Sequence, residues 1–190
     1  MNIFVSGGCK NGKSFLAQRL AKAQAQRLGV PLYYVATMRP GDGEDEARIA
    51  RHQSERAGWG FETLEQPEAL CQCLSRADRR GVFLLDSLTA WLANEMFSPQ
   101  GVDETCGDRL EKELLRFLRE TGNAVVVSDY LYSDAQRYDP LTERYRKNLA
   151  QLDRAAAREA EAVLEVAAGK PFFHKANEAF LRLWNDLEER

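Results

Sequence analysis

Residues 6–14, SGGCKNGKS, have the types and spacing of a loop that binds phosphate. Gly7, Gly12, Lys13 and Ser14 satisfy the pattern G-x-x-x-x-G-K-[ST], directly after the apolar run NIFV. The glycines let successive backbone N–H groups point at phosphate oxygens, and the helix that follows adds the positive end of its dipole. Lys13 can reach the β- and γ-phosphates, and the Ser14 hydroxyl can bind Mg²⁺. We therefore expect a bound nucleotide to contact Gly7, Gly8, Cys9, Lys10, Asn11, Gly12, Lys13 and Ser14.

Two further residues are candidates for chemistry on that nucleotide. Asp86 ends the apolar run VFLLD and is the candidate carboxylate for Mg²⁺, directly or through a water; the alternative is that it caps the helix SLTAWLANEMF. His52, in EARIARHQSER, is the candidate nucleophile, because a neutral imidazole can attack an α-phosphate and form a phosphoramidate. A single histidine on a helix is also a common solvated residue, so the residues alone leave both interpretations of His52 open. His174 lies in no motif.

Alternating segments must position these residues. Apolar runs predict strands at 2–7, 31–38, 81–86, 123–129 and 163–169, and helical spacing fills the segments between them, including 13–29, 68–81, 104–122 and 141–162. Strands separated by helices indicate right-handed crossovers and a mainly parallel sheet. We therefore predict a three-layer α/β fold of the P-loop NTPase, RecA-like type, with helices on both faces. Residues 1–175 form the nucleotide-binding and transferase domain, and 176–190 add a helix with Phe180, Leu181, Leu183 (or Trp184) and Leu187 on one side.

Composition excludes several classes of protein. The chain has 190 residues, 44% hydrophobic, with net charge −3 and a pI near 5.6, which gives no support for a nucleic-acid surface. The sequence has no apolar run of the ~20 residues that cross a bilayer, and its start does not resemble a signal peptide. Four cysteines lack the paired spacing of a zinc site. A reduced, cytoplasmic protein is the expectation.

The order of several motifs adds a resemblance. GGCKNGKS, YYVATM, EARIARHQSER, FETLEQP, FLLDSLTAWLAN and VVVS resemble, in register from residue 1 to about 175, the adenosylcobinamide kinase/adenosylcobinamide-phosphate guanylyltransferase family of cobalamin biosynthesis. The family loop is similar to G-G-x-x-S-G-K-S, and Asn11 replaces its Ser. Its guanylylated histidine lies four residues after the Arg of an Arg-Ile pair and four before another Arg. Arg48, Ile49, His52 and Arg56 keep that spacing, so the resemblance implies that His52 is the nucleophile.

The resemblance also implies substrates and further nucleotide contacts. FETLE is similar to the family's W-x-T-x-E, which places Glu65 on a carboxylate used for the guanine nucleotide, and Asp86 matches the acid that ends the third strand. The implied activities are phosphorylation of the aminopropanol hydroxyl of adenosylcobinamide by ATP or GTP, and transfer of GMP from GTP through the histidine. A homotrimer is implied as well. The loop after the second strand, which lines the nucleotide site, corresponds to Ala36, Thr37 and Met38.

The second half departs from the family. Where the family has S-N-E-V-G-x-G-x-V-P, this chain has SDYLYSDAQR, so Asp129 and Tyr130 replace Asn and Glu, and Tyr132 and Asp134 replace glycines. Loss of two permissive glycines predicts a reshaped loop. The later R-D-x-x-G-x-x-N-Q pattern is also changed, at Lys147, Ala150, Asp153 and Arg154, and Ala57 replaces a Pro. The alternatives to an active bifunctional enzyme are therefore a divergent P-loop small-molecule kinase and an NTP-binding paralogue with an altered or lost acceptor.

Overall fold

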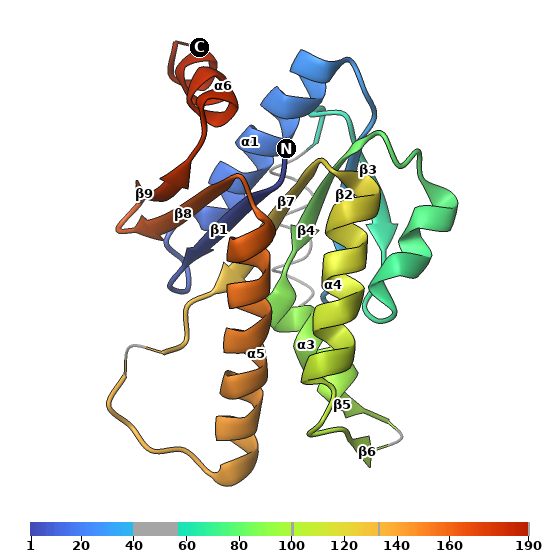
Figure 1. Ribbon diagram of the computed structural model, residues 1–190, viewed down its shortest axis with the longest axis vertical. Coiled ribbons are helices and arrows are strands. Elements are labelled where there is room, and N and C mark those ends of the chain that lie inside the picture. Colours follow the sequence, from blue (N-terminus) through green and yellow to red (C-terminus); the bar gives the residue numbers. More distant parts are fainter. Residues whose placement is uncertain (40–56, 100, 133, 190) are drawn as a thin grey trace.

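A seven-stranded sheet forms the centre of the computed structural model, which describes residues 1–39, 57–99, 101–132 and 134–189 (Figure 1). The strand order is β3-β2-β4-β7-β1-β8-β9, and every neighbouring pair is parallel except β8 with β9. The strands are β1 (Ile3–Gly7), β2 (Leu32–Ala36), β3 (Phe61–Glu65), β4 (Val82–Asp86), β7 (Ala124–Asp129), β8 (Ala162–Ala167) and β9 (Lys170–Ala176), and a separate hairpin joins β5 (Phe97–Ser98) to β6 (Gly101–Val102). The helices are α1 (Lys13–Leu28), the 3-10 helix η1 (Leu70–Arg76), α3 (Leu88–Met96), α4 (Gly107–Thr121), α5 (Pro140–Glu159) and α6 (Glu178–Glu188).

Helices cover both faces of the sheet (Figure 1). Successive residues of a strand point to opposite faces. Phe4 of β1 therefore packs in the core formed with α3, α4 and α5, whereas Ile3 and Val5 pack in the core formed with α1 and α6. Because the central strands are buried on both sides, they are continuous apolar runs and do not alternate with polar residues. This arrangement confirms the predicted α/β fold with a mainly parallel sheet.

Several elements differ from the prediction. The segment 68–81 was expected to be an α-helix, but only Leu70–Arg76 is helical, as a 3-10 turn that carries the buried Leu70, Cys73 and Leu74. FETLE forms edge strand β3, half exposed, and β9 pairs with β8 after a tight turn at Ala168 and Gly169. Their sequences lack the strong apolar runs of the central strands, because one side of an edge strand meets solvent.

The C-terminal helix α6 packs against α1. Arg19 of α1 donates to the carbonyl oxygen of Leu187 (3.1 Å), and Phe180 and Leu187 are buried against the α1 side of the sheet. Leu181, expected on the packed side together with Leu183, is instead 43% exposed, since the buried face consists of Phe180, Leu183 and Leu187. The predicted helix is thus confirmed, with a corrected inner face.

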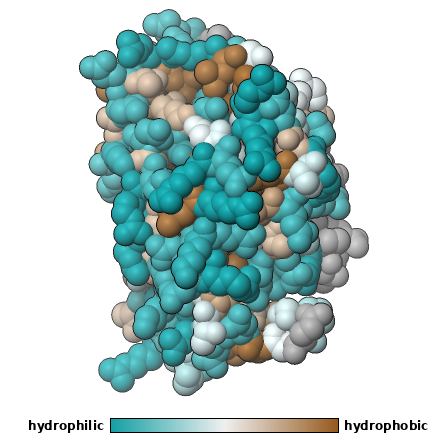
Figure 2. All heavy atoms as spheres, turned by 45° about the vertical axis from the view of Figure 1, so that its right-hand side comes forward, coloured by the Kyte–Doolittle hydropathy of each residue, from teal (hydrophilic) through white to brown (hydrophobic). Residues whose placement is uncertain are grey.

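The face of the molecule shown in Figure 2 is mainly polar. On this face, hydrophobic atoms gather in separate small groups among hydrophilic ones. Within the described residues, none of the helices has the length and apolar character needed to cross a membrane.

Candidate nucleotide site

The loop between β1 and α1 has the shape that the sequence predicts for phosphate binding. It connects the carboxyl end of a central strand to the first turn of α1, whose N-cap is Gly12 with φ of 91°. At this φ a residue with a side chain is strained, so glycine is needed to turn the chain into the helix. The strand–loop–helix order places the positive end of the α1 dipole at the loop.

Asn11 and Gly7 attach this loop to strand β8. The Asn11 side chain donates from Nδ2 to the carbonyl oxygen of Val166, and its Oδ1 accepts from the backbone N–H of Lys13 (3.4 Å). A Cβ atom on Gly7 would lie 2.4 Å from that same Val166 oxygen. Asn11, which replaces the family's Ser, therefore connects the loop, the helix start and the neighbouring strand.

Lys13 is held by two partners within the loop region. Its Nζ donates to the carbonyl oxygen of Gly8 (3.1 Å) and lies 2.5 Å from Oδ1 of Asp129, at the end of β7. The side chains of Lys13 and Asp129 are 6% and 15% exposed. The ammonium group is therefore kept at the loop by a carboxylate that motif analysis did not assign to the site.

Asp86 lies at the same edge of the sheet. It ends β4, in register with Ala36 of β2, and its Oδ2 accepts a hydrogen bond from the Tyr34 hydroxyl (2.9 Å). The alternative that Asp86 caps α3 is wrong, because Ser87 is the N-cap and its hydroxyl accepts from the N–H of Ala90. Asp86 is half-buried and has no cationic side chain as partner among the described residues. A carboxylate at this edge of the sheet fits Mg²⁺, which is usually held by one or two protein groups together with phosphate oxygens.

Thr37 connects the end of β2 to the residue that follows β4. It is fully buried; its Oγ1 donates to the carbonyl oxygen of Ser87 (2.9 Å) and accepts from the Ser87 N–H (2.7 Å). Asn94 of α3 donates to the Thr37 carbonyl oxygen (2.7 Å). Of the other predicted contacts, Ala36 and Met38 are half-buried beside it, and Glu65 ends β3 in register with Ala36 with its side chain exposed. The ends of β2, β3 and β4 therefore meet at one edge.

His52 and Arg56, together with Arg48 and Ile49, lie outside the described residues. Their roles stay predictions.

Asp153, a half-buried acid whose Oδ1 atom is fully buried, lies close to the site. Asp153 of α5 accepts from the Tyr132 hydroxyl at Oδ2 (2.8 Å). Burial raises the pKa of Asp153 to about 6; the hydroxyls of Ser128 and Tyr132 oppose this rise, and the Asp129 carboxylate adds to it. Burial also raises the pKa of Tyr132, followed by the effect of Asp153, so this tyrosine remains a neutral donor. Two acids, Asp129 and Asp153, thus lie close together where the family pattern has Asn in both places.

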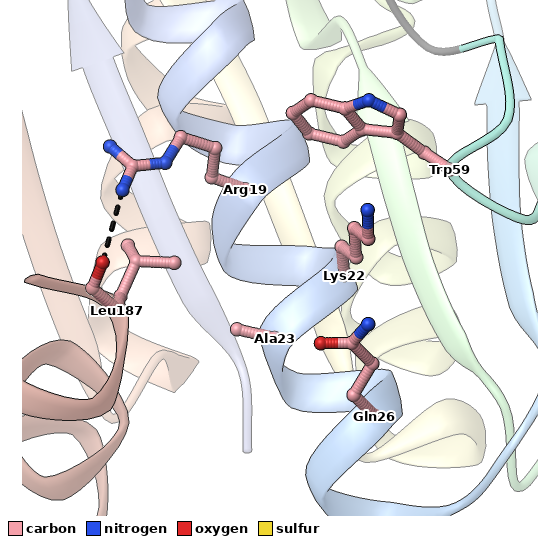
Figure 3. A pocket seen from close by; sticks show the side chains of 6 residues that line it. All are labelled: Arg19, Lys22, Ala23, Gln26, Trp59 and Leu187. Atoms are coloured by element: carbon pink, nitrogen blue, oxygen red, sulfur yellow. Dashed lines mark hydrogen bonds between the residues drawn. The ribbon is translucent and has the colours of Figure 1, made fainter. Parts of the chain in front are cut away.

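A separate hollow lies along α1, away from its first turn. Its volume is about 290 Å³. Figure 3 shows Arg19, Lys22, Ala23 and Gln26 on α1, Leu187 on α6 and Trp59 across from them. Lys22 Nζ lies 4.6 Å from the centre of the Trp59 ring and Arg19 bonds Leu187. None of the nucleotide contacts predicted within the described residues lines this hollow.

Comparison with known proteins decides the family. The model of the family "Cobinamide kinase / cobinamide phosphate guanyltransferase" matches residues 3–173. The chain belongs to this family. Its relatives include the "Bifunctional adenosylcobalamin biosynthesis protein CobP" of Pseudomonas aeruginosa, 37% identical over 176 residues that cover 90% of this chain and 95% of that protein. The resemblance stated from the motifs is confirmed, and the family is one of kinase and guanylyltransferase enzymes.

Solved structures support the fold independently. The ATPase domain of G40P aligns with a TM-score of 0.52 at 13% identity, covering 93% of this chain and 77% of that one. At this identity the likeness shows the fold alone, which is that of a P-loop ATPase.

Proposed function

We propose that this chain phosphorylates the aminopropanol hydroxyl of adenosylcobinamide with ATP or GTP and then transfers GMP to the product through His52. The observation that carries the proposal is a P-loop whose Lys13 lies at the same sheet edge as Asp86, in a chain that belongs to this family.

Each residue has a role in this proposal. The backbone amides of residues 8–14 and the Lys13 ammonium bind the β- and γ-phosphates and stabilise charge on the transferred phosphoryl group or on leaving pyrophosphate. Ser14 and Asp86 hold Mg²⁺, which supplies charge neutralisation at the phosphates when bound. In the second reaction the His52 imidazole attacks the α-phosphorus, the bond to the β-phosphate oxygen breaks, and pyrophosphate leaves. Arg56 and Glu65 contact the nucleotide, and the assembly is a homotrimer.

Labelling tests the transferase half. Incubation with α-labelled GTP and Mg²⁺ should leave acid-labile, base-stable label on the wild type and on His174→Ala, which alters the other histidine of the chain. The label should be absent from His52→Ala. Absence of label on the wild type would contradict the proposed transferase reaction. The remaining candidates would then be a kinase and a nucleotide-binding paralogue.

Loss of Lys13 tests the phosphate loop. Lys13→Ala should weaken nucleotide binding and slow phosphorylation, because it removes the positive charge at the β- and γ-phosphates. Lys112→Ala, an exposed lysine on α4, is the matched control. Unchanged turnover of adenosylcobinamide in Lys13→Ala would contradict the assignment.

A further inference from the structure

Asp129 occupies the position between the two parts of the nucleotide site. It ends β7, the strand that lies between β4, which ends in Asp86, and β1, which leads into the phosphate loop. The register pairs Gly7 with Asp129 and Asp86 with Val127, so β7 continues two residues beyond the level of Asp86. A side chain here lies beside the phosphate loop, on its Asp86 side.

The backbone around Asp129 is fixed from two directions. Its N–H donates to the Thr89 hydroxyl of α3 (2.9 Å), and the N–H of Tyr130 donates to the carbonyl oxygen of Gly7 (2.9 Å). Thr89 is held in turn, since its carbonyl oxygen accepts from the Tyr145 hydroxyl of α5 (2.9 Å). Such bonds hold the backbone from which the carboxylate projects, and the contact with Lys13 holds the carboxylate itself.

The charged and titratable groups around Asp129 come from three elements. Lys13 of α1 contacts it directly, at 2.5 Å. Asp153 and Tyr145 of α5 face it, and its negative charge contributes to the rise in the pKa of both, after the larger effect of burial. Tyr132, in the loop after β7, bonds Asp153. Lys13 is thus the cation in contact with a carboxylate that otherwise faces acidic or neutral groups among the described residues.

We propose that Asp129 is the general base of the phosphoryl-transfer reaction. The proposal rests on the proposed function. The acceptor O–H bond breaks and its proton goes to the Asp129 carboxylate; the acceptor oxygen forms a bond to the γ-phosphorus; the bond from the γ-phosphorus to the β-phosphate oxygen breaks, and the nucleoside diphosphate leaves. The contact with Lys13 places Asp129 for this role. The Lys13 ammonium binds the transferred phosphoryl group in the proposed function, so the carboxylate that touches this ammonium lies close to the attacked phosphorus.

The departure from the family supports this role. The family pattern has Asn-Glu where this chain has Asp129-Tyr130, so this turn keeps one carboxylate but carries it one residue earlier. The rewritten second half therefore retains an acid beside the phosphate loop.

The test separates the two reactions of one enzyme. In Asp129→Asn, which preserves size and can still accept from Lys13, phosphorylation of adenosylcobinamide should slow by about 10²–10⁴-fold in kcat. Labelling of the protein by α-labelled GTP should stay within about threefold of wild type, because the attacking nitrogen of a neutral imidazole carries no proton that a base would have to remove. Formate added to Asp129→Ala should restore part of the phosphorylation rate and leave labelling unchanged. Asp186→Asn is the control. It removes the acidic partner of Arg27 from an exposed ion pair between α6 and α1, and it should change neither reaction.

Three outcomes would overturn the proposal. The first is phosphorylation by Asp129→Asn at the wild-type rate. The second is an equal loss of both reactions in that variant, together with weaker GTP binding. The third is that formate fails to restore phosphorylation in an Asp129→Ala protein that still becomes labelled by GTP. An equal loss would mean that Asp129 only positions Lys13. The failure of the proposed function is a different result, since the wild type itself would then form no phosphorylated adenosylcobinamide.

Discussion

Replacement of Asp153 by asparagine should stabilise the protein above neutral pH. Burial raises the pKa of this acid from 3.8 to about 6 in the folded chain. Between these two values the folded state binds more protons than the unfolded state, so the free energy of unfolding falls as pH rises through this window. Asparagine keeps an oxygen that can accept from Tyr132 and removes the buried charge.

The size of the effect follows from the shift. A rise of about two pKa units corresponds to about 3 kcal/mol when Asp153 is fully ionised. Because the replaced group makes a hydrogen bond whose geometry changes, we expect Asp153→Asn to gain about 1–3 kcal/mol at pH 8. For a chain of this length, that is a rise in Tm of about 2–4 °C per kcal/mol. The gain should shrink as the pH falls towards 4 and vanish below about pH 3, where the acid is neutral in both states.

Thermal unfolding followed by circular dichroism from pH 4 to 8 measures the difference in Tm between Asp153→Asn and the wild type. Asp134→Asn is the matched control, because Asp134 also accepts from a tyrosine, Tyr138 (2.5 Å), but its side chain is 46% exposed. The control should show no gain that grows with pH. If Asp153→Asn were no more stable than wild type at pH 8, or gained equally at pH 4 and pH 8, the reasoning from burial would be refuted.

Three further outcomes are expected. Gly7→Ala should lower nucleotide affinity and destabilise the fold by about 1–3 kcal/mol, because the added carbon meets a backbone oxygen of β8; normal GTP binding by titration calorimetry would contradict this. Thr37→Val should cost about 1–3 kcal/mol in denaturant unfolding, since it leaves the backbone N–H and carbonyl of Ser87 without their buried partner, and an unchanged midpoint would argue against it. A thiol reagent at pH 8 should modify the exposed Cys9 and be blocked by GTP, whereas Cys73, whose pKa burial raises to about 12, should react only after unfolding; mass spectrometry that finds Cys73 modified first would reverse that order.

Local patterns predicted the parts of this protein that depend on local physics. The phosphate loop was found because Gly7, Gly12, Lys13 and Ser14 lie close together in the sequence, and the central strands because burial on both faces makes them apolar throughout. The edge strands β3 and β9 were missed because their pairing partners, not their own residues, decide their structure.

Contacts between distant elements were the harder part of the site. The ion pair of Lys13 with Asp129 joins residues over a hundred positions apart, and the sequence showed Asp129 only as a departure from a pattern. The role of Asp86 was open between a ligand of Mg²⁺ and the N-cap of α3, because Asp is a good residue for both. Geometry separated them, since the Ser87 hydroxyl reaches Ala90.

Helix α6 has a practical consequence for handling the protein. It covers the later turns of α1, where Arg19 bonds Leu187 and Arg27 pairs with Asp186. The first turn of α1 follows the phosphate loop. Removal of α6 would therefore expose apolar residues of α1, the helix that begins at Lys13, to solvent. Purification tags belong at a site that leaves this tail free to dock, and proteolysis of the tail should be monitored whenever catalytic rates vary between batches.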